Sequence, residues 1–314
     1  MTIKGVAEFE SATEHDVAIP YLQRTRDYYQ ALGYGAPYRW AHGTQVPFQR
    51  LRQPLPHCRV ALITTAAPYQ SDKGDQGPGA AYNARAKFYA VYSGDTAREH
   101  DLRIAHVAID RQHTSAEDPA TYFPLAQLRH AARAGRIGSV AARFHGAPSN
   151  RSQRATLEVD GPEIVARCQD DAVDAAILVA NCPVCHQTLS LVARLLEAHG
   201  IATVVMGCAK DIVEHVGVPR LLFSDFPLGN AAGRPNDLPS QVQTLELALQ
   251  LLEAAPAART TLQSPLRWSE NPDWKLDYCN IARLSPQEIA QRRAAFDKGK
   301  AQAKALRVET KSSG

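Results

Sequence analysis

The residues best suited to chemistry are Cys182 and Cys185, in the sequence Asn-Cys-Pro-Val-Cys-His at 181–186. They follow an apolar run at 177–179 that is typical of a buried parallel strand, and a helical spacing of leucines follows them up to Gly200. A thiol at the start of a helix meets unpaired N–H groups and the positive end of the helix dipole, which favour its thiolate. We therefore predict that Cys182 attacks and that Cys185, one turn later, closes a disulfide onto it.

Two neighbours and two alternatives accompany this pair. His186 can add positive charge or move a proton, or it can simply cap or pack. Cys208 follows the next apolar strand, so a third thiol is expected at the same crevice. A single Cys-X-X-Cys can be half of a structural zinc site, but the sequence has no second pair of matching spacing. The other alternative is two inert cysteines; redox or nucleophilic chemistry without a metal is preferred.

The densest cluster of titratable groups lies between residues 106 and 113. The segment 101–110 is predicted to be extended, with His106 and Asp110 on one face. Arg111 is suited to a two-pronged contact with a substrate carboxylate, and a histidine to general acid or base work. The alternatives are a buried Asp110–Arg111 pair that ties a strand to its loop, or a metal site that includes His113.

Two loops should face the same side of the predicted sheet. The loop after the apolar run 218–223 carries Asp225 and Asn230, which are candidates for orienting a substrate, with turn capping as the alternative. The glycine-rich segment 66–87 follows a first strand at 59–65. Its glycines do not have the spacing of a phosphate-binding loop, so we expect a mobile loop over the site instead.

The alternation of apolar strands with amphipathic helices predicts an α/β fold, a Rossmann-like or flavodoxin-like parallel sheet with helices on both faces. Residues 58–255 form this core, with two lobes meeting near 145–155 as a possibility. Residues 1–57, rich in aromatic side chains and proline, are expected to wrap the core, or else to form a partner surface or substrate wall. Residues 256–314 form a C-terminal extension with a basic, solvated tail.

Composition excludes several classes of function. The 314 residues are 45% hydrophobic and 21% charged, with a formal net charge of +3. This balance gives no reason to expect nucleic acid or an anionic membrane as partner. The sequence lacks an apolar run of the ~20 residues that cross a bilayer and lacks a signal-peptide core. Six cysteines without an export signal indicate a reducing cytoplasm.

Motifs spread over about half of the chain resemble one known family. They are Leu102, His106, Asp110-Arg111, 123–125, Leu128, 135–140, Asp170, 174–178, the Cys182–Cys185 turn, 196–204, 216–220 and 226–230. In these residues the chain resembles the selenoprotein B family of glycine, sarcosine, betaine and D-proline reductases. The N-terminal segment and the residues from 256 onward show no such match.

The resemblance implies an activity and partners. The family carries a selenocysteine-X-X-Cys motif, and this chain has Cys182 at the selenocysteine position. The resemblance implies reductive cleavage of a C–N bond in a small amino acid or amine, a pyruvoyl group on a separate subunit, an outside thiol reductant, and a homo- or hetero-oligomer. A cysteine thiolate is a weaker nucleophile than a selenolate. A general thiol–disulfide oxidoreductase, or a non-catalytic subunit whose pair organises a partner interface or a metal, are therefore kept as alternatives.

Overall fold

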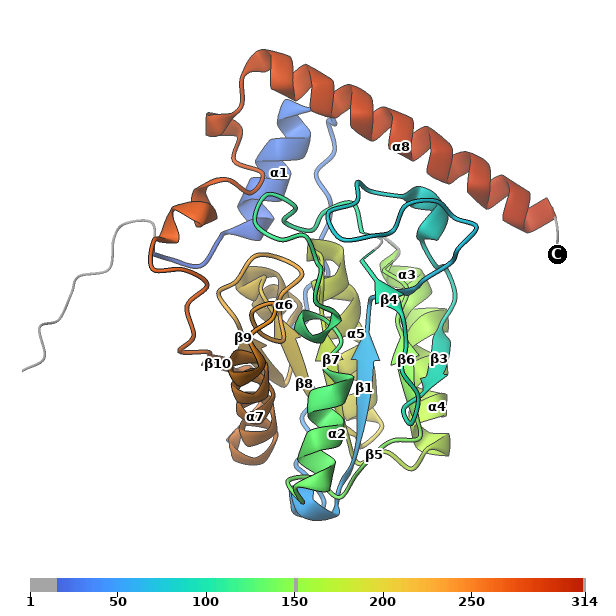
Figure 1. Cartoon of the computed structure of the whole chain (residues 1–314), viewed down its shortest axis with the longest axis vertical. Helices are drawn as coiled ribbons and strands as arrows, with labels where there is room; N and C mark the ends of the chain where they lie inside the picture. Colours follow the sequence, from blue (N-terminus) through green and yellow to red (C-terminus); the bar gives the residue numbers. More distant parts are fainter. Residues whose placement is uncertain (1–15, 105, 150–151, 313–314) are drawn as a thin grey trace, which may run out of the picture.

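The computed structural model describes residues 16–104, 106–149 and 152–312, with residues 302–312 as backbone only. Within these residues, eight strands form one sheet (Figure 1). Its order is β10 (Thr260–Gln263), β9 (Arg220–Phe223), β8 (Ala202–Gly207), β7 (Ala175–Val179), β1 (Arg59–Thr64), β6 (Arg143–Gly146) and β3 (Tyr92–Asp95), with β5 (Ser139–Val140) also paired to β1. All pairings in this sheet are parallel except that of β3 with β6.

Helices cover both faces of the sheet, as the sequence predicts. On one face, alternate residues of the central strands pack with α2 (Leu125–Arg133) and α7 (Leu238–Ala254). On the other face they pack with α4 (Gly161–Asp170), α5 (Pro183–Ala198) and α6 (Lys210–Val216). Because β7 and β8 are buried on both sides, both read as continuous apolar runs rather than as alternating ones. The α/β fold class is confirmed.

The order of the strands locates a crevice. From β1 the chain winds to β6 on one side, and then crosses to β7 and continues through β8, β9 and β10 on the other side. The direction of winding therefore reverses between β1 and β7, and open α/β sheets bind ligands at the carboxyl ends of the strands at such a point. Thr65 and Asn181 lie there, and the Asn181 amide donates a hydrogen bond of 3.0 Å to the Thr65 hydroxyl.

One expectation is corrected by the structure, and another stays a prediction. β1 pairs directly with β7 over five residue pairs, so strands from before and after residues 145–155 lie in one sheet; the possible division into two lobes there stays a prediction. The segment 101–110 is not one extended strand. Only β4 (Leu102–Arg103) is extended, paired with β2 (Ala67–Pro68) in a small second sheet, and turns follow from residue 107. The period of two therefore does not set the directions of His106 and Asp110.

The two terminal segments meet above the carboxyl ends of the strands (Figure 1). The N-terminal segment contains α1 (Tyr21–Ala31), and the C-terminal extension ends in α8 (Pro286–Ser312). The ring of Phe296 on α8 lies 5.4 Å from that of Tyr29 and 5.2 Å from that of Tyr34. Both segments therefore wrap the end of the core at which the crevice opens.

Short helices complete the described chain, and their bounds are as follows. They are the 3₁₀ turns Leu55–His57, Ala84–Ala86, Pro119–Thr121, Pro272–Leu276 and Ile281–Arg283, together with α3 (Gln153–Ala155) and a π-helical turn at Thr156–Asp160. Ser152 caps α3, since its hydroxyl accepts a hydrogen bond from the Ala155 N–H. In the part of the chain that the structure describes, no helix is long and apolar enough to span a membrane.

Candidate functional site

The Cys-X-X-Cys turn lies where β7 passes into α5. Cys182 is the N-cap residue of α5 and Pro183 occupies the first helical turn, where its missing N–H is not needed. The Cys182 Sγ accepts a hydrogen bond of 3.2 Å from the Cys185 N–H, as a serine hydroxyl would at this position. Both sulfurs thus lie at the positive end of a 16-residue helix. The predicted strand–turn–helix arrangement is confirmed.

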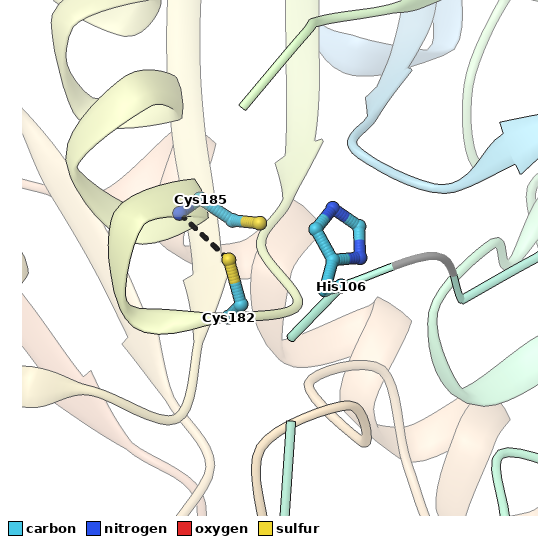
Figure 2. A group of neighbouring side chains, drawn as sticks. All are labelled: His106, Cys182 and Cys185. Atoms are coloured by element: carbon cyan, nitrogen blue, oxygen red, sulfur yellow. Dashed lines mark hydrogen bonds between the residues drawn. The ribbon is translucent and has the colours of Figure 1, made fainter. Parts of the chain in front are cut away.

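A histidine from another part of the chain completes the cluster. His106 lies in the loop after β4, and its ring faces the two cysteines (Figure 2). One ligand atom from each of His106, Cys182 and Cys185 lies within 4.8 Å of the other two. His106 is 7% exposed and Cys182 6%, whereas Cys185 is fully buried. The structure therefore joins two groups of residues that are 76 positions apart in the sequence.

The two thiols share their ionisation. Burial alone would raise the pKa of Cys185, but hydrogen bonding with the Cys182 thiol and the nearby charge of His106 outweigh it, so that this pKa lies well below the ordinary value. Burial and the contact with Cys185 raise the pKa of Cys182 well above the ordinary value. The pair consequently loses one proton readily and holds the second.

His186 fixes the turn through both of its ring nitrogens. Its Nδ1–H donates to the Cys182 carbonyl at 2.7 Å, and its Nε2 accepts the N–H groups of Cys208 and Ala209 at 2.9 and 3.1 Å. Burial lowers its pKa to about 4. Gly207 allows this approach, because a Cβ there would come within 2.7 Å of the ring. These contacts fit the alternative of packing and capping, and proton transfer by His186 stays a prediction.

A cavity of about 690 Å³ opens at the cluster. Among the described residues, Cys182 and His106 line it and Cys185 does not. Its other walls come from α1 and the residues after it, from the loop 106–112, and from the C-terminal extension including α8. The N-terminal segment, for which wrapping was preferred, therefore both wraps the core and forms part of the cavity wall.

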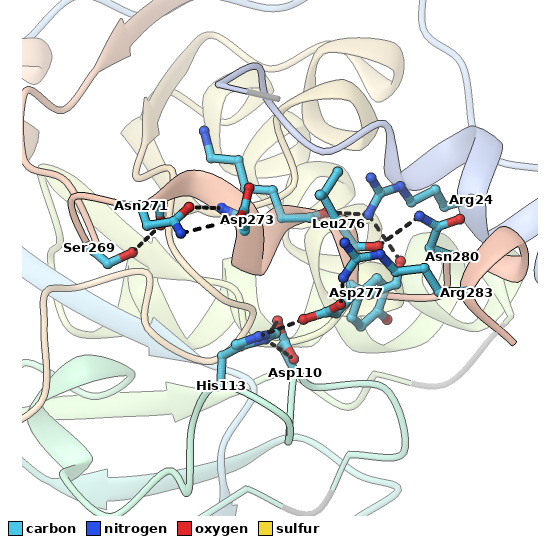
Figure 3. A network of polar contacts seen from close by, with 12 residues as sticks. Arg24, Asp110, His113, Ser269, Asn271, Asp273, Leu276, Asp277, Asn280 and Arg283 are labelled. Atoms are coloured by element: carbon cyan, nitrogen blue, oxygen red, sulfur yellow. Dashed lines mark hydrogen bonds and ion pairs between the residues drawn. The ribbon is translucent and has the colours of Figure 1, made fainter. Parts of the chain in front are cut away.

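A polar network joins the loop 106–113 to the C-terminal extension (Figure 3). His113 Nδ1 lies 3.0 Å from both carboxylate oxygens of Asp110, and its Nε2 lies 3.2 Å from Asp277. Asp277 in turn pairs with Arg283. Burial raises the pKa of Asp110, which lines the cavity, while His113 opposes that rise. The network fixes Asp110 at the cavity wall.

Arg111 binds the backbone instead of Asp110. Its guanidinium donates to the carbonyls of Ala80, Val107 and His106 at 3.0, 3.3 and 2.7 Å. The predicted Asp110–Arg111 pair is not seen, because His113 is the partner of Asp110. Arg111 still lines the cavity, but most of its directed N–H groups hold the loop that presents His106.

Comparison with known proteins adds a relationship to this geometry. A family model described as glycine/sarcosine/betaine reductase selenoprotein B matches residues 32–181. D-proline reductase subunit gamma of Acetoanaerobium sticklandii is 29% identical over 213 residues, which cover 67% of this chain and 84% of that protein. The chain is thus similar to the selenoprotein B reductase family over about half of its length. No solved structure matches it.

The extent of the match differs from that of the sequence motifs. The selenoprotein B model begins at residue 32, so residues 32–57 lie within the match, although their motifs did not indicate a resemblance. It ends at residue 181, one position before Cys182. The equivalence of Cys182 with the selenocysteine of the selenoprotein B family is therefore carried by the sequence motif and not by this match.

Three predicted site residues lie elsewhere. Asp225 pairs with Lys275 of the C-terminal extension, which also binds Asp16 at 3.0 Å. Asn230 donates to the Pro227 carbonyl at 3.1 Å within its own turn, which is the capping alternative. Burial raises the pKa of the Cys208 thiol far above its ordinary value. None of Asp225, Asn230 and Cys208 is among the described residues that line the cavity.

Sequence reasoning missed the basic side chains of the cavity. Its described lining includes Arg26, Lys87, Arg292 and Lys300, besides Arg111, and Asp110 is the acidic residue among them. The signal was present as the basic character of α8, which was interpreted as a solvated tail. A helix of low amphipathicity gives no indication of what it covers, and only the fold places it over the site.

Proposed function

We propose that the chain is a reductase subunit that cleaves a carbon–heteroatom bond, a C–N bond in a small amino acid or amine, with Cys182 as nucleophile. The observation that carries this proposal is the asymmetry of the pair. Cys182 lines the cavity, and Cys185 lies buried behind it, with the two sulfurs within 4.8 Å of each other. Similarity to the selenoprotein B family supports reductase chemistry.

The first step forms a carbon–sulfur bond. The pair shares one negative charge, and when its remaining proton moves from Cys182 to Cys185, the Cys182 thiolate attacks the substrate carbon. The C–N bond breaks, its electron pair passes to nitrogen, and nitrogen takes a proton. Cys185 then gives its proton to His106, which lies within the same 4.8 Å cluster, and becomes a thiolate.

The second step releases the product. The Cys185 thiolate attacks the Cys182 sulfur, an S–S bond forms, and the C–S bond breaks with its electron pair left on carbon, which takes a proton. The substrate has then gained two electrons and two protons, and the two thiols have lost them. An outside dithiol reduces the Cys182–Cys185 disulfide and restores the pair.

A partner subunit belongs to this proposal. The resemblance puts a pyruvoyl group on a separate subunit, where it would activate the substrate amine. The relative from Acetoanaerobium sticklandii is itself named as a subunit. A cavity of about 690 Å³ exceeds what a small amino acid fills, so it has room for a partner's group beside the substrate.

The cavity favours a small substrate over a protein disulfide. Cys182 is only 6% exposed and lies beneath walls contributed by both terminal segments. A general thiol–disulfide oxidoreductase presents its attacking sulfur to extended polypeptide, which this position does not allow. Activity on a generic protein disulfide is therefore expected to be negligible.

Turnover of the complex purified through a tag on this chain tests the proposal. Glycine, sarcosine, betaine and D-proline are each offered with a dithiol as reductant, and the released product is measured. Cys182→Ser is expected to lower turnover by at least ~10³-fold, because the nucleophile is removed. Cys185→Ser is expected to stall after the first step, with the substrate carbon bound to Cys182 and visible by mass spectrometry. Full activity of a folded Cys182→Ser variant would overturn the assignment.

A further inference from the structure

The cluster at the start of α5 has the composition of a metal site. It offers two thiolate sulfurs and one imidazole nitrogen from three buried residues, all within 4.8 Å of one another (Figure 2). Two cysteines separated by two residues are the commonest half of a zinc site. The sequence predicts no metal because a second such pair is missing, and it could not show that His106 would supply a third ligand from 76 positions away.

A second observation points to a ligand at this place. Only 7% of the surface of His106 is exposed, yet its Nδ1 has no hydrogen-bond partner among the described residues. A buried polar atom without a partner is costly, and native proteins rarely leave one. The ring is also held from behind, since Arg111 binds the His106 carbonyl at 2.7 Å. The imidazole is thus held beside the thiols, and its Nδ1 is left without a hydrogen bond from the described residues.

We propose that Cys182, Cys185 and His106 form a Zn²⁺ site when the pair is reduced, with the fourth coordination position open to the cavity. Two thiolates and a neutral imidazole are a ligand set that soft divalent metals prefer. Tetrahedral zinc needs about 3.5–4 Å between ligand atoms, so side-chain rotations from the present separations suffice. The +2 charge of the metal cancels the two thiolates, which removes the cost of burying both.

Zinc then opposes turnover. A sulfur that shares a lone pair with the metal is a weaker nucleophile toward a substrate carbon than a free thiolate, and an oxidised Cys182–Cys185 pair cannot bind the metal. Zinc would hold the reduced pair in a protected state, and formation of the disulfide would release it. This inference concerns the reduced pair alone and stands whether or not the chain cleaves C–N bonds.

Cobalt binding to the full chain provides the test. The chain is stripped with a chelator, kept reduced with a phosphine, and titrated with Co²⁺, whose thiolate-to-metal absorption and intense visible bands report tetrahedral sulfur ligation. One Co²⁺ per chain, displaced by Zn²⁺, is expected.

Cys182→Ser and Cys185→Ser each remove one sulfur ligand, so each is expected to reduce the thiolate-to-cobalt absorption by at least about half. His106→Asn is expected to weaken binding by more than ~10-fold. Cys279→Ser, a thiol that lines the same cavity outside the cluster, is the matched control and should bind as wild type does.

A measurement on the unaltered chain keeps the test independent of variant folding. Zn²⁺ at one equivalent is expected to protect Cys182 from iodoacetamide, as followed by mass spectrometry, and prior oxidation of the pair is expected to abolish metal uptake. A Co²⁺ spectrum without thiolate bands, unprotected Cys182, or a His106→Asn variant that binds as tightly as wild type would each overturn the three-ligand site. None of these results would bear on turnover, which is measured separately with the purified complex.

Discussion

The two sulfurs differ in access more than in their place on the helix. Cys182 occupies the N-cap, and its Sγ accepts a hydrogen bond from the Cys185 N–H, whereas the Cys185 side chain is fully buried. A thiolate on Cys185 is favoured by its neighbours, but only Cys182 lines the cavity. The buried sulfur therefore stores the charge of the pair, and the accessible sulfur meets the substrate.

Alkylation across a pH series tests this division. The first pKa of the pair is lowered, so one thiolate is present above that pKa and is lost only as the pH falls through it, well below the range of an ordinary cysteine. We expect iodoacetamide to label Cys182 rapidly at pH 7, because the remaining proton of the pair can move from Cys182 to Cys185 as Cys182 reacts. In Cys185→Ser, burial holds the pKa of Cys182 high, so labelling at pH 7 should slow by at least ~10-fold. Cys208, buried outside the cavity, serves as the unreactive reference; equal rates for wild type and Cys185→Ser would contradict the shared charge.

For single residues, the sequence predicted which side chains belong to the site but not which way they point. The start of α5 and the Cys182–Cys185 pair could be recognised because their spacing in the sequence defines them. Proton transfer was assigned to His186 because it is adjacent in sequence, but the end of β8 offers it two N–H groups and fixes its ring. His106 was recognised as a site residue, yet its contact with the thiols depends on a loop whose course follows from tertiary packing.

At the scale of elements, a buried ion pair joins the N-terminal segment to the sheet. Glu197 at the end of α5 lies 2.9 Å from Arg220 of β9 and accepts hydrogen bonds from the N–H and hydroxyl of Thr203 at 2.6 and 2.9 Å. The Gln49 N–H also donates to Glu197, and Arg220 donates to the Gln49 carbonyl at 2.7 Å. Gln49, which precedes β1, is thus held by one group from α5 and one from β9, and Thr203 of β8 fixes Glu197.

Removing one charge of this pair should destabilise the chain more than removing both. Glu197→Gln leaves the Arg220 cation buried without a counter-charge, and we expect the free energy of unfolding to fall by about 3–5 kcal/mol. Glu197→Gln with Arg220→Met should recover much of this loss, because no buried charge remains. Urea denaturation of the wild type, Glu197→Gln, Arg220→Met and the double variant gives the four free energies of unfolding. A double variant less stable than Glu197→Gln alone would contradict the argument.

Central strands were predictable and edge strands were not. The apolar runs at β1, β7, β8 and β9 were each recognised, because a strand buried on both faces has no other explanation in a chain of this composition. β3 and β10 lie at the two edges, are only half buried, and lack either a continuous or an alternating pattern. Their pairing is decided by the strand already in place beside them.

At the scale of the whole molecule, the cavity is an assembly of distant segments. The core supplies the reactive sulfur, while α1 and α8 supply aromatic and basic walls. The Asp110–His113–Asp277 network links the loop of His106 to the extension that carries α8. No pattern in the sequence indicates that these segments meet, since contacts between residues more than 160 positions apart leave no local signal.

Acid should destabilise the whole fold partly through His186. Its folded-state pKa of about 4 lies below the ordinary 6.5, so the unfolded chain takes up a proton between these values that the folded chain refuses. Stability from the neutral ring is complete above pH 6.5 and declines as the pH falls toward 4, by up to about 3 kcal/mol. Buried His145 acts in the same direction, whereas Asp211, with its pKa raised to about 6 by burial, acts in the opposite one.

Comparison with His186→Asn isolates this contribution, because His145 and Asp211 titrate in both proteins and cancel. At pH 7 the variant should be less stable, since the two N–H groups lose their shared acceptor. As the pH falls to 4, the advantage of wild type should shrink by about 3 kcal/mol. Urea midpoints at half-unit pH intervals provide the measurement. A difference that stays constant from pH 7 to pH 4 would mean that the folded chain accepts the proton, and that the ring is not locked between Cys182 and the end of β8.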